Sequence, residues 1–141
     1  MENTEARARF AAARVARLAT VDAAGVPHLV PVTFAVAGDE VVFAVDHKPK
    51  STFALKRLAN IAANPRVSFL VDHYDDDWDR LWWVRADGEA VVTDRAEPLS
   101  WLRAKYPQYE EQPPQGPVVV TRVEVWRGWS ASRRKGLSGT T

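Results

Sequence analysis

Four basic residues lie within ten positions of a chain that is otherwise close to neutral. They are Lys48, Lys50, Lys56 and Arg57, in the stretch HKPKSTFALKR. The whole chain balances 19 lysines and arginines against 18 aspartates and glutamates, and no acidic residue lies between His47 and Val71. Cations grouped in this way either bind an anionic group or form a solvated basic surface.

The position of the first two lysines favours an anion site. Lys48 and Lys50 directly precede a helix that the sequence predicts over 51–63. A helix N-terminus has free backbone N–H groups and a partial positive charge, so cations are unfavourable there unless an anion lies between them. With the hydroxyl of Ser51, the two lysines would form a cradle for a phosphate group. The alternative is that all four basic residues are simply solvated.

Two prolines mark a strand that precedes this segment. Pro27 and Pro31 are four positions apart in PHLVPVTFAV, so both remove N–H donors from the same edge of one strand. The strand therefore either lies at the edge of a sheet or presents this edge to a flat ligand.

The elements around these residues are expected to be short strands joined by turns. The patterns predict a helix from Glu2 to Arg17, a second from Ser51 to Ala63 and a third from Pro98 to Tyr106. The predicted strands are RLATVD, PHLVPVTFAV, VVFAVD, RVSFLVDHY and VVVTRVEVWRGW. RLWWVRADGEAVVTD fits either a hairpin or one long strand with a glycine bulge. The expected fold class is mainly β (α+β), a small barrel of about six mostly antiparallel strands with peripheral helices.

Length and composition limit the number of domains and the class of protein. The 141 residues are expected to form one domain over 1–129, followed by a polar, disordered tail over 130–141. The chain has no cysteine and no apolar run of about 18 residues, and its first 20 residues lack the apolar block of a secretory signal. These features predict a cytoplasmic protein without disulfides or a membrane span. A net charge of +1 argues against nucleic acid as a partner.

Other groups of residues give weaker signals. The aspartates that follow the predicted strand RVSFLVDHY do not have the spacing of a calcium-binding loop. They therefore predict a solvated loop that pairs with Arg80 or with a basic surface of a partner subunit. The three histidines have no metal-ligand spacing, so no metal site is expected, although one of them could ligate haem. Trp82 and Trp83 are adjacent in a strand and point to opposite faces, so one can fill the core while the other covers an interface or a ligand ring.

The segment LATVDAAGVPHLVPVTFAVAGDEVVFAVDHKPKSTFALKRLANIAANPRVSFLVD resembles a known superfamily. It is similar to the flavin and deazaflavin oxidoreductases of the split β-barrel fold, the superfamily of pyridoxamine 5′-phosphate oxidase. DDWDRLWWVRADGEAVV and YPQY resemble the coenzyme F420-dependent branch found in high-GC bacteria. The resemblance covers about residues 8–129 and favours the long bulged strand over the hairpin.

The resemblance also implies a function and a set of site residues. It implies a homodimer with two cofactor sites at the subunit interface and hydride transfer to a small organic acceptor, which the sequence does not identify. It places the cofactor ring against Pro31, Val32 and Thr33. The phosphate is expected at Lys48, Lys50 and Ser51, while Lys56 and Arg57 either reach the acidic tail of the coenzyme or face solvent.

Two alternatives remain open at the level of the sequence. One is an FMN-dependent oxidoreductase; the other is a non-catalytic protein that carries or sequesters a flavin or haem. The chain lacks the arginine-rich phosphate-binding strand and the C-terminal motif of the pyridoxamine phosphate oxidases proper, which makes FMN and a pyridoxal-type substrate the less expected choice. Hydride transfer needs no obvious acid or base, so the sequence identifies no catalytic residue.

Overall fold

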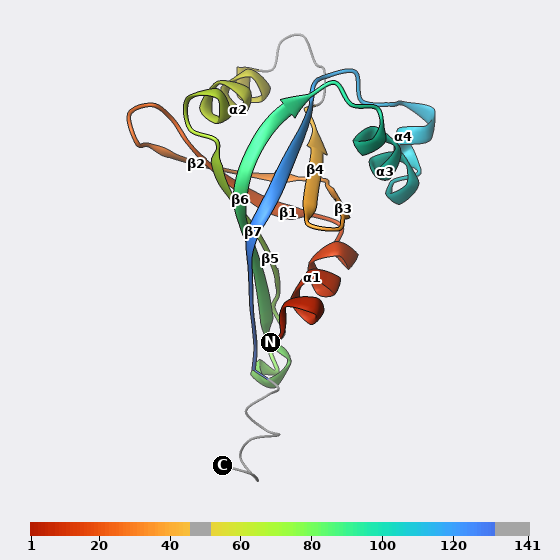
Figure 1. Cartoon of the computed structure of the whole chain (residues 1–141). Coiled ribbons are helices and arrows are strands. Elements are labelled where there is room, and N and C mark those ends of the chain that lie inside the picture. The colour runs from red at the N-terminus through yellow and green to blue at the C-terminus, as the bar shows by residue number, and fades with distance from the viewer. Residues whose placement is uncertain (46–51, 132–141) are drawn as a thin grey trace.

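The computed structural model describes residues 1–45 and 52–131, whose seven strands form one curled antiparallel sheet in the order β2-β1-β5-β6-β7-β4-β3 (Figure 1). The strands are β1 (Ala16–Val21), β2 (Pro27–Val32), β3 (Ala35–Ala37), β4 (Glu40–Ala44), β5 (Arg66–His73), β6 (Trp82–Thr93) and β7 (Val118–Ser130). The helices are α1 (Asn3–Ala12), α2 (Thr52–Ala63), α3 (Glu97–Lys105) and α4 (Gln108–Glu111), with a 3-10 turn, η1, at Trp78–Arg80. The expected fold class, a mainly β split barrel with peripheral helices, is confirmed.

The predicted strand PHLVPVTFAV is in fact two strands. β2 ends at Val32, the chain bends through Thr33 and Phe34, and β3 begins at Ala35. The two strands lie at opposite edges of the sheet, so the bend links the two ends of the curled sheet. The prediction of an edge strand at the two prolines is confirmed, because β2 pairs only with β1 among the described residues.

Helix α1 is shorter than predicted. The alanine- and arginine-rich run suits a helix up to Arg17, but α1 ends at Ala12 and β1 begins at Ala16. Along β1 the burial alternates from residue to residue, with Ala16 and Leu18 fully buried. The gain from burying one face of a strand in the core outweighs helix propensity here.

Strand β6 settles the ambiguity between a hairpin and a long strand. It runs unbroken from Trp82 to Thr93 and pairs with β5 on one side and β7 on the other. The register on β7 shifts between Asp87 and Gly88, which is the expected glycine bulge. The long bulged strand is therefore confirmed and the hairpin is wrong.

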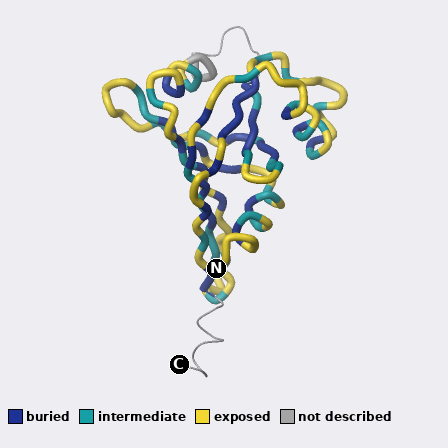
Figure 2. Tube along the Cα trace, in the orientation of Figure 1, coloured by how far each residue is buried: buried dark blue, intermediate teal, exposed yellow. Residues whose placement is uncertain are grey.

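The core lies inside the curl of the sheet, where buried residues follow its inner face (Figure 2). Phe10 of α1 packs against Phe34 and Trp126, with ring centroids 4.8 and 5.3 Å apart, so α1 is anchored to the core by one aromatic side chain. Helix α2 is held to β1 by a buried hydrogen bond in which the Asn60 side-chain amide donates to the Thr20 hydroxyl (3.0 Å). These contacts fix α1 and α2 against the sheet.

Helix α3 packs on the outside of the sheet. Leu102 and Tyr106 form a second, smaller cluster with Ala35, Val42 and Val120 of three neighbouring strands. At the other end of the chain, β7 continues past the expected boundary at residue 129, and the buried Ala131 donates its N–H to the carbonyl of Leu81 (2.9 Å). Among the described residues, no helix is long and apolar enough to cross a membrane.

Candidate functional site

A groove of about 520 Å³ lies on the outer face of β1, β2, β5 and β6. Its apolar lining includes Leu29, Leu70 and Trp83, and its charged lining includes Arg17 and Arg85. Leu29 is 69% exposed and Leu70 is 37% exposed, which is unusual for leucines on a regular sheet. Exposed apolar surface with charged residues at its margin marks an interaction or ligand-binding face.

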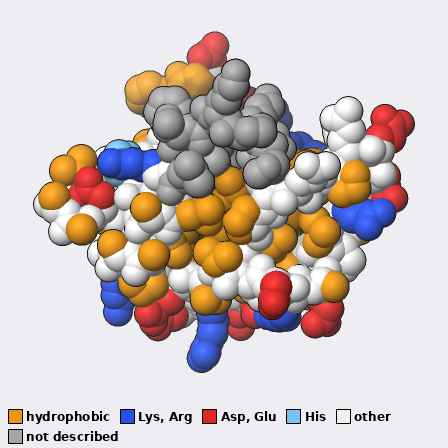
Figure 3. Space-filling model, turned by 90° about the horizontal axis from the view of Figure 1, so that it is seen from above, with side chains coloured by type: hydrophobic (Ala, Val, Ile, Leu, Met, Phe, Trp, Pro, Cys, Tyr) orange, Lys and Arg blue, Asp and Glu red, His pale blue; other side chains and the backbone are white. Residues whose placement is uncertain are grey.

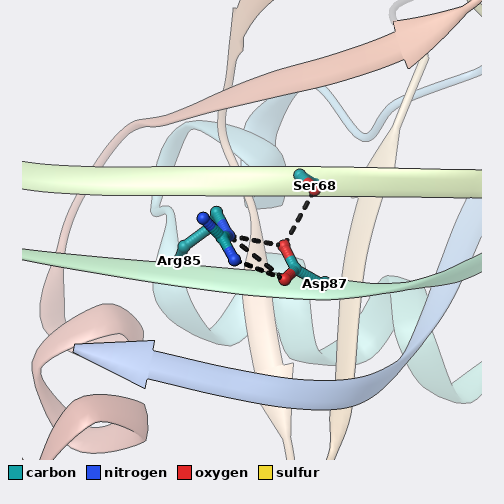
Figure 4. Close-up of polar contacts among 3 residues, drawn as sticks. All are labelled: Ser68, Arg85 and Asp87. Atoms are coloured by element: carbon teal, nitrogen blue, oxygen red, sulfur yellow. Dashed lines mark hydrogen bonds and ion pairs between the residues drawn. The ribbon is translucent and has the colours of Figure 1, made fainter.

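A hydrogen-bonded group of three side chains lies at one end of this groove (Figure 4). Arg85 donates from Nε to Oδ1 of Asp87 (2.9 Å) and from Nη2 to Oδ2 (3.0 Å), and the Ser68 hydroxyl donates to Oδ1 (2.8 Å). A second hollow, of about 350 Å³, shares Ser68 with the groove and reaches Asp87. Because the carboxylate of Asp87 is occupied by these partners, it orients Arg85 rather than acting as a free base.

The two adjacent tryptophans point to opposite faces of β6, as predicted. Trp82 packs against the core, stacks on His73 (centroids 6.2 Å apart) and carries the Arg9 guanidinium over its ring. Trp83 lines the outer groove. One tryptophan therefore contributes to packing while the other is available to a ligand ring or a second protein surface.

The three residues expected against a cofactor ring have different environments. Pro31 is exposed and pairs in register with Arg17 of the groove. Val32 is buried in the core at 7% exposure, so its side chain is not available and only its backbone can face a ligand. Thr33 is partly exposed, and its hydroxyl lies 2.7 Å from that of Tyr109.

The expected phosphate residues Lys48, Lys50 and Ser51 lie outside the described residues. Of the helix cations, Lys56 is exposed and lies close enough to Asp22 to help lower the pKa of that carboxyl. The main cause of the lowered pKa of Asp22 is the hydrogen bond from the backbone N–H of Val26. Lys56 therefore faces the turn between β1 and β2.

Arg57 has a different environment from Lys56. Its guanidinium is half-buried, which lowers its pKa, and its buried Nε has no hydrogen-bond partner among the described residues. No described carboxylate lies within 4.0 Å of the charged atoms of Lys56 or Arg57. A half-buried cation with an unused donor is a candidate ligand for an anionic group.

The end of the molecule that carries α2 and the α3–α4 segment has an apolar centre. Hydrophobic side chains gather between these elements, and charged side chains lie around the rim (Figure 3). Val91 and Val92, at the same end of β6, are 61% and 46% exposed. Helix α2, which carries Lys56 and Arg57, is therefore next to apolar surface. This arrangement suits a ligand with both a ring system and anionic groups.

The aspartate-rich segment between the end of β5 and the start of β6 forms a loop. Asp75 lies 3.5 Å from Arg80, as predicted, and accepts a hydrogen bond from the backbone N–H of Asp77 (2.8 Å). No group of three potential metal ligands is present among the residues that the structure describes. The loop is thus organised by its own hydrogen bonds and ion pairs.

Two sets of functional candidates were not recognised from the sequence. Arg85 and Asp87 are two apart in one strand, a spacing that puts both on one face, and this signal was available. Their partner Ser68 depends on the β5–β6 register. The contacts of Tyr106 and Tyr109 with residues more than 70 positions earlier could not be found without the fold.

A curled sheet of seven antiparallel strands, linked across its two edges by a bend and flanked by peripheral helices, defines the split β-barrel class. The sequence matches pyridoxamine 5′-phosphate oxidase over residues 3–130, and the chain belongs to this family. No functionally curated protein matches the sequence.

Several solved structures share the fold. A conserved hypothetical protein of Mycobacterium tuberculosis is 27% identical, with a TM-score of 0.76, over 97% of this chain and 89% of that chain. A FAD-binding protein of Mesorhizobium loti is 20% identical (TM-score 0.67; 91% and 94% covered). The haem storage protein HutZ of Vibrio cholerae is 16% identical (TM-score 0.68; 92% and 95% covered). At these identities the latter two show the fold alone.

Proposed function

We propose that this protein is an oxidoreductase that binds coenzyme F420 and transfers hydride between the reduced deazaflavin and a small organic acceptor. Membership of the pyridoxamine 5′-phosphate oxidase family supports a flavin-type cofactor. The resemblance of DDWDRLWWVRADGEAVV and YPQY to the coenzyme F420-dependent branch supports the deazaflavin. FMN and haem are the competing cofactors.

The observation that carries the proposal is the environment of Arg57. Its guanidinium is half-buried, and its buried Nε has no hydrogen-bond partner in the part of the chain that the structure describes; such a donor costs free energy unless an acceptor is supplied. Coenzyme F420 carries a phosphate and an acidic tail, so the residues present fit this group. The cations of the β4–α2 region would hold the anionic part, and the end of β2 would contact the ring.

The bound deazaflavin would supply the hydride chemistry, and the chain's residues would bind and orient it. Pro31 has no N–H and is exposed opposite Arg17 of the groove, so its apolar ring is available for contact with an aromatic surface. The apolar walls formed by Leu29, Leu70 and Trp83 would exclude water from that surface. Arg85, held in place by Asp87, has donors left to orient a polar acceptor.

We also propose that two copies associate through the groove face to complete the site, as the resemblance implies. A Leu29→Glu change is expected to raise the dimer dissociation constant about tenfold or more, because it would bury a charge in an apolar contact. Light scattering across a concentration series measures this constant. Val26→Glu, at a residue that is 50% exposed in the adjoining turn, is the matched control. A monomeric parent protein, or a Leu29→Glu dimer as stable as the parent, would contradict the prediction.

Replacing Arg57 with methionine tests the proposed anion ligand. Arg57→Met keeps the apolar stem and removes the charge, so the affinity for coenzyme F420 is expected to fall about tenfold. The stability of the cofactor-free protein should stay unchanged or rise, because the change removes a partly desolvated cation that has no ion-pair partner among the described residues. Arg80→Met, at a side chain that is 69% exposed in η1, is the control. Fluorescence titration and thermal unfolding together give both quantities; equal binding by parent and Arg57→Met would remove Arg57 from the site.

The proposed function itself is tested by titrating coenzyme F420, FMN and haem separately into the cofactor-free protein. Tight binding of coenzyme F420, followed by oxidation of its reduced form on addition of a suitable acceptor, is the expected result. The three cofactors have distinct absorbance spectra, so the material that co-purifies is also informative. Binding of FMN or haem with no measurable binding of coenzyme F420 would overturn the proposal.

A further inference from the structure

Two tyrosines from the α3–α4 segment hold the bend between β2 and β3. Tyr106 and Tyr109 are separated by two residues, and their rings meet edge to face with centroids 5.7 Å apart. Their hydroxyls bond to Phe34 and Thr33, the two residues of the bend. The α3–α4 segment is therefore tied to the end of the strand that the proposed function places against the cofactor ring.

The hydroxyl of Tyr106 forms hydrogen bonds with two backbone groups. It accepts a hydrogen bond from the backbone N–H of Phe34 (3.1 Å) and donates to the carbonyl of Arg14 (2.8 Å). Phe34 lies between strands at opposite edges of the sheet, so its N–H is satisfied by a side chain rather than by a strand. Tyr106 is buried, and burial raises its pKa, so the hydroxyl keeps its proton and this bridge is structural.

The hydroxyl of Tyr109 has a different kind of partner. It meets the side-chain hydroxyl of Thr33 at 2.7 Å, and either oxygen can be the donor. Both side chains are partly exposed, so the pair remains within reach of a ligand. If Tyr109 donates, Thr33 is free to donate to a ligand carbonyl; if Thr33 donates to Tyr109, its oxygen is free to accept from a ligand N–H.

We propose that Tyr109 is a positioning residue that orients the Thr33 hydroxyl toward the polar edge of the bound ring. This inference rests on the proposed function and extends it to the choice of ring. Flavins and deazaflavins share a pyrimidine edge in which carbonyl groups alternate with an N–H, and a reversible hydroxyl pair can match either group. A porphyrin ring has no such edge. The pair therefore favours a flavin-type heterocycle over haem, because a site that hydrogen-bonds one ligand loses those bonds with another.

The test is a double-mutant cycle on the two hydroxyls. Tyr109→Phe and Thr33→Val are each expected to weaken coenzyme F420 binding about tenfold, the cost of one hydrogen bond in a partly buried site. The double variant should bind no worse than the weaker single variant, because the two hydroxyls act as one unit. The absorbance maximum of the bound cofactor should shift toward that of the free cofactor. Thr33→Ser, which restores a hydroxyl, should recover most of the affinity lost in Thr33→Val.

Tyr74→Phe is the matched control, because Tyr74 is 66% exposed at the far end of β5. Tyr109→Phe and Tyr74→Phe should unfold at similar temperatures, which separates a positioning effect from loss of structure. If the parent binds coenzyme F420 and Tyr109→Phe binds it equally, with the same spectrum, the inference is overturned while the proposed function stands. Additive effects in the cycle would also overturn it. If the parent binds neither coenzyme F420 nor FMN, both proposals fail together.

Discussion

Replacing Lys48 and Lys50 together with alanine is expected to weaken coenzyme F420 binding by at least about a hundredfold. Each lysine is proposed to donate a charge-assisted hydrogen bond to the cofactor phosphate, worth roughly 1.5–3 kcal/mol. The two lysines lie between β4 and the start of α2 at Thr52, and the first turn of α2 contains no acidic residue. Binding by the parent should also weaken as salt rises, because part of the attraction is screened.

The stability of the cofactor-free protein distinguishes a ligand site from a structural role. Removing two cations next to a positive helix end should leave the unfolding free energy unchanged or slightly higher. Arg7→Ala is a suitable control, since Arg7 forms an exposed ion pair with Asp39 on the side of helix α1. Lys105 is not a neutral control, because its Nζ donates to the carbonyl of Ala13 (2.6 Å) and lies 3.8 Å from the centroid of the Phe34 ring. Parent-like affinity in the double variant would favour the solvated basic surface instead.

The change Gly88→Ala should lower the free energy of unfolding by about 3 kcal/mol, the upper part of the range for overpacked cores. Gly88 is buried at the bulge of β6, and a Cβ atom there would overlap the carbonyl oxygen of Arg122. The same Cβ would lie 2.9 Å from the carbonyl carbon of Arg122 and 3.0 Å from Cα of Val123. These are backbone atoms of the paired strand, so the collision can be relieved only by separating β6 from β7.

Gly38→Ala separates this collision from the general cost of replacing a glycine. Gly38 has φ of +58° and open space around it, so the substitution meets only left-handed backbone strain, about 1 kcal/mol. Chemical denaturation of the two variants and the parent measures the difference. If Gly88→Ala is destabilised no more than Gly38→Ala, the bulge has room for a Cβ atom and the predicted collision with the backbone of β7 does not occur.

Much of the fold could be predicted from local patterns. Turn residues and runs of strand-forming residues located the strands, and the spacing of Pro27 and Pro31 indicated an edge. The bend at Thr33 and Phe34 was missed because both flanking segments have strand-forming residues. Nothing local shows that the chain changes from one edge of the sheet to the other there. The side chains that hydrogen-bond to this bend belong to tyrosines more than 70 residues away.

The candidate site was predictable only in part. The cluster of cations in a neutral chain predicts an anion site, which stays a prediction; the structure adds that the buried Nε of Arg57 has no partner among the described residues. The sequence could not show that the side chain of Val32 is buried, since a strand's register decides which residues face inward. It also could not show the groove, because its walls come from two pairs of strands, β1–β2 and β5–β6, that are distant from each other in the sequence.

The half-buried lysine beside the Phe34 ring couples folding to proton release. Burial, with a smaller contribution from the charge of Arg14, lowers the pKa of Lys105 to about 8. In the unfolded chain its pKa is the ordinary value of about 10.4. Between these values the unfolded state binds more protons than the folded state, so Lys105 makes the folded state more stable as the pH rises from about 8 toward 10. Folding under mildly alkaline conditions therefore expels a proton from the contact between α3 and the bend.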